Sequence, residues 1–152
     1  MINYGSQSVD KKDINAVVKV LKSKLLTQGP VTLEFEKKLS KYFKSKFSLA
    51  VSSGTSALNI AAKVLGWEKG DLVFVSPITF LASANCILNT GATPKFIDIN
   101  LNDYSIDLDK LEKELKKNPK KNKAIVITDY AGHPSDWIRI SKLKKKYKLQ
   151  VI

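Results

Sequence analysis

The residues best suited to chemistry in this chain form one short run of hydroxyl side chains and glycine, Ser52–Ser56 (Ser-Ser-Gly-Thr-Ser). The run follows an apolar stretch, Phe47–Val51, and precedes a stretch of helical periodicity. The start of a helix leaves backbone N–H groups without helical partners, and the positive end of the helix dipole lies there. Those donors and the hydroxyls of Ser53, Thr55 and Ser56 together suit a phosphate group.

The same residues also fit an ordinary helix cap. Serine and threonine are favoured at the N-cap, so Ser53 or Thr55 could simply close the first turn of a core helix. Neither of the glycine motifs that mark common nucleotide loops, G-x-x-x-x-G-K-[ST] and G-x-G-x-x-G, occurs here. The turn alone therefore leaves both a phosphate site and a structural cap open.

Apolar patterning predicts the elements that would hold this turn. Strand-like runs and helix-like stretches alternate after residue 46, which predicts an α/β domain with three layers, α-β-α, and a mainly parallel sheet. Asp10 and Asp107 are placed to cap two of the helices. The strands are expected near residues 47–51, 72–76, 94–99, 124–128 and 149–152, and the helices near residues 10–21, 31–43, 54–65, 78–88, 107–115 and 136–147.

Three polar or aromatic loops would then meet at one edge of the sheet. The turn Ser52–Ser56, the segment Pro77–Phe80 and the segment Asp129–Ser135 are all expected at the carboxyl ends of strands. Ligands bind at that edge in open parallel sheets. The shared edge therefore favours the phosphate interpretation over the cap alone.

The net charge of +12 raises the possibility of nucleic-acid binding. However, Arg139 is the single arginine among 26 basic residues, whereas base contacts and bidentate phosphate contacts favour arginine. The lysines are also spread over several expected helices and the loop 116–123. We therefore expect no nucleic-acid partner. The alternative, a basic phosphate- or nucleic-acid-binding module, predicts binding to DNA or RNA that weakens steeply with salt.

Composition also limits the compartment and the roles of single residues. No apolar run reaches membrane-spanning length, and the first residues lack the apolar centre of a signal peptide, so we expect a cytoplasmic protein with no membrane partner. The single cysteine, Cys86, is expected to be a buried packing residue, and the single histidine, His133, a solvated loop residue. No metal site is expected.

The last expected strand is cut at Ile152. A complete domain rarely ends on an unpaired apolar strand, because such an edge promotes aggregation. The sequence is therefore expected to be truncated, with residues 1–45 forming an N-terminal arm and helices, and residues 46–152 forming part of a larger domain.

Several short motifs, taken in order, resemble one family. It is the DegT/StrS group of pyridoxal-phosphate-dependent nucleotide-sugar aminotransferases, which have the aspartate-aminotransferase fold (fold type I). The similarity is nearest to transaminases that act on C4 of UDP-linked 4-keto-6-deoxy-N-acetylhexosamines. The motifs are Leu26-Thr-Gln-Gly-Pro30, Phe35-Glu36, Val51-Ser-Ser-Gly-Thr-Ser-Ala-Leu58, Gly70-Asp71, Ser76-Pro-Ile-Thr-Phe80, Gly91-Ala-Thr-Pro94 and Asp129-Tyr-Ala-Gly132.

The resemblance implies roles for the cofactor-binding positions. Gly54, Thr55 and Ser56 would hold the phosphate of pyridoxal 5'-phosphate at the helix start, and Phe80 would stack on its pyridine ring. From the sequence alone, Phe80 could equally be a core aromatic residue at the start of a helix. Residues 46–152 would then be the first part of the large, cofactor-binding domain.

The resemblance also implies substrate contacts and a departure from the family pattern. Gln28 and Gly29 match a substrate-facing turn, and Tyr4 lies on an arm that would approach the nucleotide sugar. Asp129 and Tyr130 stand where many relatives carry a segment that contains histidine, so the resemblance assigns them no role.

The implied activity is transfer of an amino group, with glutamate as the expected donor, to a nucleotide-linked 4-keto-6-deoxy sugar for cell-surface polysaccharide or glycan synthesis. In the family, the aspartate that pairs with the pyridine nitrogen and the Schiff-base lysine come after the position of Ile152. No catalytic residue is therefore expected within this chain, and a homodimer is expected of the full-length enzyme. The alternative within the fold is a sugar dehydratase, in which histidine replaces that lysine.

Overall fold

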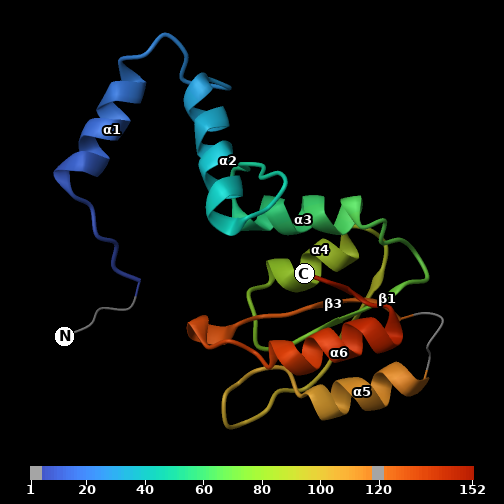
Figure 1. The fold of residues 1–152 in the computed structure, drawn as a ribbon. Helices are drawn as coiled ribbons and strands as arrows, with labels where there is room; N and C mark the ends of the chain where they lie inside the picture. The colour runs from blue at the N-terminus through green and yellow to red at the C-terminus, as the bar shows by residue number, and fades with distance from the viewer. Residues whose placement is uncertain (1–4, 118–121) are drawn as a thin grey trace. The chain divides into compact units, whose positions relative to one another are not determined.

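The computed structural model describes residues 5–117 and 122–152, and its contacts divide the chain into two compact units, Met1–Ala50 and Val51–Ile152 (Figure 1). The first unit holds helices α1 (Lys11–Leu21) and α2 (Pro30–Phe43). The Asp10 carboxylate accepts backbone hydrogen bonds at the start of α1, and the Asp13 carboxylate accepts one from Asp10, so the predicted cap is a complete capping box.

The second unit contains a parallel sheet with the strand order β2-β1-β3-β4. Val73 of β1 is in register with Pro94 of β2 and with Ala124 of β3, and Ile125 is in register with Val151. The strands are β1 (Leu72–Val75), β2 (Thr93–Phe96), β3 (Asn122–Val126) and β4 (Gln150–Val151).

Helices cover both faces of this sheet, which confirms the three-layer prediction (Figure 1). Alternate residues of β1 and β3 face opposite sides, as expected for pleated strands. One face packs on α3 (Gly54–Val64) and α4 (Ala82–Leu88), through a cluster of Ala62, Trp67, Val73, Val75, Cys86, Ile87, Ala92, Ala124 and Val126.

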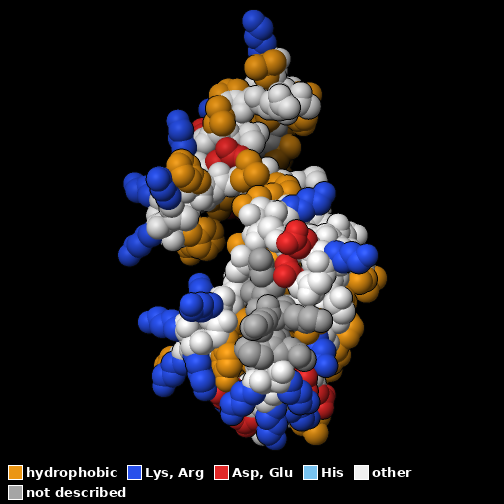
Figure 2. Space-filling model, turned by 90° about the vertical axis from the view of Figure 1, so that its right-hand side faces the viewer, with side chains coloured by type: hydrophobic (Ala, Val, Ile, Leu, Met, Phe, Trp, Pro, Cys, Tyr) orange, Lys and Arg blue, Asp and Glu red, His pale blue; other side chains and the backbone are white. Residues whose placement is uncertain are grey.

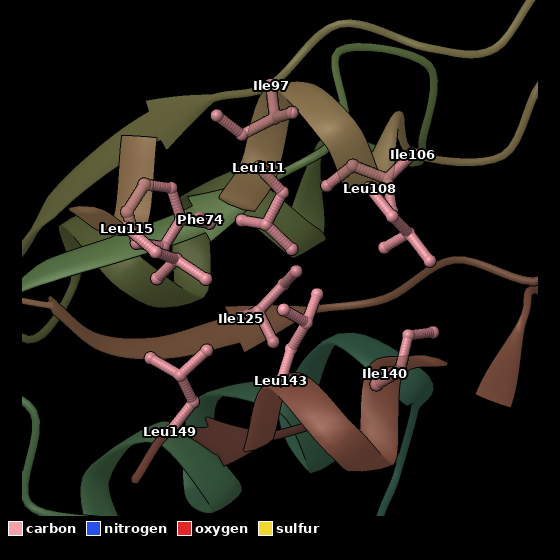
Figure 3. Close-up of a cluster of buried hydrophobic side chains, with 10 residues drawn as sticks. All are labelled: Phe74, Ile97, Ile106, Leu108, Leu111, Leu115, Ile125, Ile140, Leu143 and Leu149. Carbon is pink, nitrogen blue, oxygen red and sulfur yellow. The ribbon is translucent and has the colours of Figure 1, made fainter. Parts of the chain in front are cut away.

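The other face packs on α5 (Leu108–Lys117) and α6 (Trp137–Tyr147). In Figure 3, Phe74 and Ile125 of the sheet lie among the leucine side chains of these two helices. The cluster consists of Phe74, Ile97, Ile106, Leu108, Leu111, Leu115, Ile125, Ile140, Leu143 and Leu149.

The predicted strand at residues 47–51 is wrong. No strand occurs there, and Phe47 and Leu49 are exposed rather than buried. The physical reason is that a strand needs a neighbour to pair its backbone, and none of the four sheet strands pairs with this segment. Apolar patterning alone cannot report whether such a neighbour exists.

Some element bounds also differ from those predicted. Helix α4 begins at Ala82 rather than at residue 78, because residues 76–79 form a turn in which the Ser76 hydroxyl accepts from the Ile78 N–H. The strand expected over residues 94–99 ends at Phe96, and Ile99 instead forms an isolated antiparallel bridge with Ile106. The expected loop 116–123 is shorter: α5 continues through Lys117, β3 begins at Asn122, and residues 118–121 lie outside the described residues.

Two further observations concern membrane-spanning helices and the distribution of basic side chains. Across residues 5–117 and 122–152, no helix combines the length and apolar character needed to cross a membrane. Lys and Arg side chains form several separate groups on the face presented in Figure 2.

Candidate functional site

The sheet has a topological switch point between β1 and β3. From β1 the chain crosses over one face through α4 to β2, whereas from β3 it crosses over the opposite face through α6 to β4. The two connections therefore diverge at the carboxyl ends of neighbouring strands, and open α/β sheets bind ligands at such a position, which we call the crevice. The loops that border it are residues 76–81 and 127–136.

Helix α3 points its N-terminus toward this edge of the sheet (Figure 1). At its other end, the Trp67 indole N–H donates to Gln150 Oε1 at 2.6 Å, and Gln150 Nε2 donates to the Leu65 carbonyl at 3.0 Å. Gln150 is the first residue of β4, so the C-terminal end of α3 lies where the strands begin. Eleven residues of helix span about 16 Å, enough to carry the N-terminus to the carboxyl ends of the strands.

Ser53 caps α3, as predicted. Its hydroxyl oxygen accepts from the Ser56 N–H at 3.1 Å, and the Ser56 hydroxyl oxygen lies 3.1 Å from the hydroxyl oxygens of both Ser52 and Ser53. Within the described residues, the N–H groups of Gly54 and Thr55 and the Thr55 hydroxyl make no hydrogen bond. The cap therefore leaves the N–H groups of Gly54 and Thr55 and the Thr55 hydroxyl available as hydrogen-bond donors.

The space beside these donors is open. A Cβ added at Gly54 would meet no atom within 4 Å, and Gly54 and Thr55 are exposed. The start of α3 thus combines open space, two unpaired backbone N–H groups and a hydroxyl, which are features that suit an anion.

Phe80 lies in the loop after β1, four residues after the buried Ser76, and the residue is 75% exposed. This exposure excludes the alternative in which Phe80 is a core aromatic residue. The same loop is tied to the loop after β3, because the Thr79 and Thr128 hydroxyl oxygens lie 2.7 Å apart. The segment that carries Phe80 is thus held beside the loop after β3.

The loop after β3 is organised by Asp129. Its carboxylate accepts from the Ser135 N–H at 2.9 Å and from the Trp137 indole N–H at 3.2 Å. The Ser135 backbone donor is the main cause of a lowered pKa for Asp129, so this carboxylate is charged at neutral pH. His133 in the same loop is exposed, as expected of a solvated loop residue.

The substrate-facing residues implied by the resemblance lie in the first unit. Gln28 has a positive φ of 50°, and a Cβ at the buried Gly29 would approach the Leu25 carbonyl oxygen to 2.9 Å. The turn at Gln28–Gly29 is therefore tightly built and needs glycine at its second position. Tyr4 lies outside the described residues.

Sequence reasoning missed a cluster of hydroxyl groups beside the crevice. Thr79 Oγ1 lies 2.9 Å from Ser83 Oγ as well as 2.7 Å from Thr128 Oγ1. The signal that could have found it is a hydroxyl residue soon after each of two neighbouring strands. Cys86, by contrast, is fully buried as predicted, and burial raises the pKa of its thiol.

A hollow of about 590 Å³ lies elsewhere, between the loop 99–107 and the starts of α5 and α6. Four aspartates line it: Asp103, Asp107, Asp109 and Asp136. Their carboxylates already cap turns and helices or pair with Arg139, and their charge opposes binding of an anion. Within the described part of the chain, no group of three or more His, Cys, Asp or Glu side chains could hold a metal ion.

Comparisons with known proteins place this geometry in context. A transaminase of Campylobacter jejuni, UDP-4-amino-4,6-dideoxy-N-acetyl-beta-L-altrosamine transaminase, is 42% identical over the whole of this chain, which covers 40% of that protein. The structure of Helicobacter pylori PseC, an aminotransferase involved in the biosynthesis of pseudaminic acid, superimposes with a TM-score of 0.89 at 38% identity, covering 98% of this chain and 40% of that one.

A third similarity concerns a structure that contains the aminated cofactor. NtdA from Bacillus subtilis, with bound cofactor PMP, superimposes with a TM-score of 0.84 at 32% identity over 94% of this chain and 33% of that one. The chain thus spans about 40% of the length of the two Campylobacter jejuni transaminases that it resembles. The similarity extends over both units, since the family's sequence model matches residues 7–152. On this match, the chain belongs to the DegT/DnrJ/EryC1/StrS aminotransferase family.

Proposed function

We propose that this chain is part of an enzyme that transfers an amino group, with glutamate as donor, to the keto carbon of a nucleotide-linked 4-keto-6-deoxy sugar. The observation that carries the proposal is the start of α3, where open N–H groups and the Thr55 hydroxyl lie at the carboxyl edge of the sheet. The transaminase from Campylobacter jejuni supports the substrate class. Because the chain spans about 40% of that relative, the activity belongs to the whole protein.

The residues at this edge fit pyridoxal 5'-phosphate. The N–H groups of Gly54 and Thr55 and the hydroxyls of Thr55 and Ser56 would hold the phosphate, which is a dianion suited to a helix N-terminus. The exposed ring of Phe80 would cover one face of the cofactor's aromatic ring. When bound, the cofactor supplies an electron sink for amino transfer.

This chain's residues would therefore bind and orient rather than move protons. The phosphate contacts fix one end of the cofactor, and the Phe80 ring fixes the plane of the other. Gln28, Gly29 and Tyr4 would face the nucleotide sugar. A homodimer and a cytoplasmic location complete the proposal, and the single buried Cys86 agrees with a reducing compartment.

Binding of pyridoxamine 5'-phosphate to the 152-residue chain tests the proposal, because this form of the cofactor needs no Schiff-base lysine. Thr55→Val removes the free hydroxyl and keeps the side-chain shape. Thr90→Val is the matched control, since the Thr90 hydroxyl donates to the Ile87 carbonyl at the far end of α4. Isothermal titration calorimetry gives each Kd.

The wild-type chain and the Thr90→Val variant should bind with similar affinity, and Thr55→Val should bind about three- to tenfold more weakly, the effect of one lost hydrogen bond. Equal affinities for all three proteins would remove the phosphate site from the start of α3. Tight binding of DNA that falls steeply with salt, without binding of the cofactor, would favour the basic nucleic-acid module instead.

A further inference from the structure

Three hydroxyl groups form a continuous chain from the buried side of α4 to the edge of the crevice. Ser83 Oγ lies 2.9 Å from Thr79 Oγ1, which lies 2.7 Å from Thr128 Oγ1. Ser83 is buried, with 7% of its surface exposed, whereas Thr79 and Thr128 are half-buried. This row of three hydroxyl groups therefore connects the interior of the domain with the switch point between β1 and β3.

The direction of the hydrogen bonds follows from counting donors. Each hydroxyl carries one hydrogen, so three hydroxyls have three donors for two links, and one hydrogen must point out of the chain. If Thr128 donated to Thr79 and Thr79 to Ser83, the hydrogen left over would be that of Ser83. If Ser83 and Thr128 both donated to Thr79, the hydrogen left over would be that of Thr79. Within the described residues neither Ser83 Oγ nor Thr79 Oγ1 has a further acceptor, and an unpaired donor away from water is costly.

The favoured direction is therefore Ser83 to Thr79 to Thr128. It leaves the Thr128 hydrogen as the outward donor, at the half-buried end of the chain. Thr128 Oγ1 then accepts from Thr79, and this hydrogen bond restricts the hydroxyl to a narrow range of orientations. A pre-oriented donor strengthens a contact because less freedom is lost on binding.

We propose that Thr128 is a ligand-binding residue, whose hydroxyl donates to an oxygen on the ring portion of the compound that occupies the crevice. This inference rests on the proposed function, in which the phosphate portion lies at the start of α3 and the aromatic portion beside Phe80. Thr128 is the second residue after β3 and is linked to the Phe80 loop through Thr79, so its hydroxyl lies at the switch point between β1 and β3.

Calorimetric binding to the full 152-residue chain tests this assignment, with pyridoxamine 5'-phosphate and inorganic phosphate as the two probes. Thr128→Val removes the hydroxyl at constant shape, and Thr128→Ser restores it. Ser83→Ala removes only the hydroxyl at the buried end of the hydrogen-bonded row. Urea unfolding of each variant checks that the fold is retained, and Thr55→Val reports on the phosphate site independently.

Thr128→Val should bind pyridoxamine 5'-phosphate about three- to tenfold more weakly, whereas Thr128→Ser and Ser83→Ala should stay within about twofold of wild type. Inorganic phosphate should bind the wild type, Thr128→Val, Thr128→Ser and Ser83→Ala with equal affinity. Unchanged binding of pyridoxamine 5'-phosphate by Thr128→Val, with weakened binding by Thr55→Val, would overturn the role of Thr128 alone. Loss of phosphate binding in Thr128→Val would also overturn it. Failure of the wild-type chain to bind would overturn both this role and the proposed function.

Discussion

At the scale of single residues, the start of α3 combines a helix cap with backbone N–H groups that have no partner within the described residues. Ser53 uses its hydroxyl to satisfy the Ser56 N–H, while the N–H groups of Gly54 and Thr55 face open space. The cap and the proposed phosphate site therefore use different groups of the same turn. The sequence could predict the turn and its cap, because serine at a helix start has a local cause.

Ser53→Asp separates the cap from the phosphate site. Aspartate caps helices about as well as serine and favours the helix dipole, so the free energy of unfolding in urea should stay within about 0.5 kcal/mol of wild type. Its carboxylate, however, repels a phosphate at the same turn, so affinity for pyridoxamine 5'-phosphate should fall at least about tenfold. Ser53→Asn is the uncharged control, and an equal loss of affinity there would contradict the electrostatic explanation.

The hydrogen bond from the Trp137 indole to the Asp129 carboxylate, in the loop after β3, should depend on pH. The Ser135 N–H, together with Trp137, lowers its pKa below 3.8, so the charged form is favoured in the folded state. Its stabilising contribution is complete above the unfolded-state pKa and is lost as the pH falls through the lower, folded-state pKa. Tryptophan fluorescence of the wild type should therefore change below pH 3.8, as the bond to the Trp137 indole is lost.

The matched variants are Asp129→Asn and Asp103→Asn. The first should lack this fluorescence transition, whereas the second should keep it, because the pKa of Asp103 is also lowered but its carboxylate bonds Ser105 rather than a tryptophan. A transition that survives in Asp129→Asn would contradict the assignment.

At the scale of elements, the strands and helices of the second unit could be predicted from the pattern of apolar residues in the sequence. The continuous apolar runs near residues 72–76 and 124–128 predicted two strands, which the structure places at residues 72–75 and 122–126. The segment 47–51 has a similar pattern but remains unpaired, since pairing depends on a distant partner. The Thr79–Thr128 link was not predictable for the same reason: it joins residues 49 positions apart.

Substitutions at two neighbouring residues of α5, Leu111 and Glu112, compare the contribution of core packing to stability with that of an ion pair. Leu111 is 1% exposed in the cluster of Figure 3, and Leu111→Ala should lower the free energy of unfolding by about 2–5 kcal/mol. Glu112 accepts from Lys146 at 2.7 Å on the solvated side of the helix, so Glu112→Ala should cost clearly less. Urea unfolding of both variants checks the order, and an equal or reversed order would contradict the packing account.

At the scale of the whole molecule, the second unit contains both apolar clusters, whereas α1 and α2 bury no side chain within the described structure. The residues proposed to hold the cofactor, Gly54, Thr55, Ser56 and Phe80, therefore lie in the unit that contains the apolar clusters. The residues expected to face the substrate, Gln28 and Gly29, belong to the first unit. Local sequence could place each group in its own element, but not the distance between the two groups.

The central claim is that the first turn of α3 holds a phosphate. The most direct measurement is two-dimensional ¹⁵N NMR of the chain during addition of pyridoxamine 5'-phosphate, with pyridoxamine as the control that lacks the phosphate. The amide signals of Gly54 and Thr55 should show the largest shifts with the phosphorylated compound and small shifts with pyridoxamine. Shifts confined to the lysine-rich end of α6, with Gly54 and Thr55 unmoved, would contradict the claim.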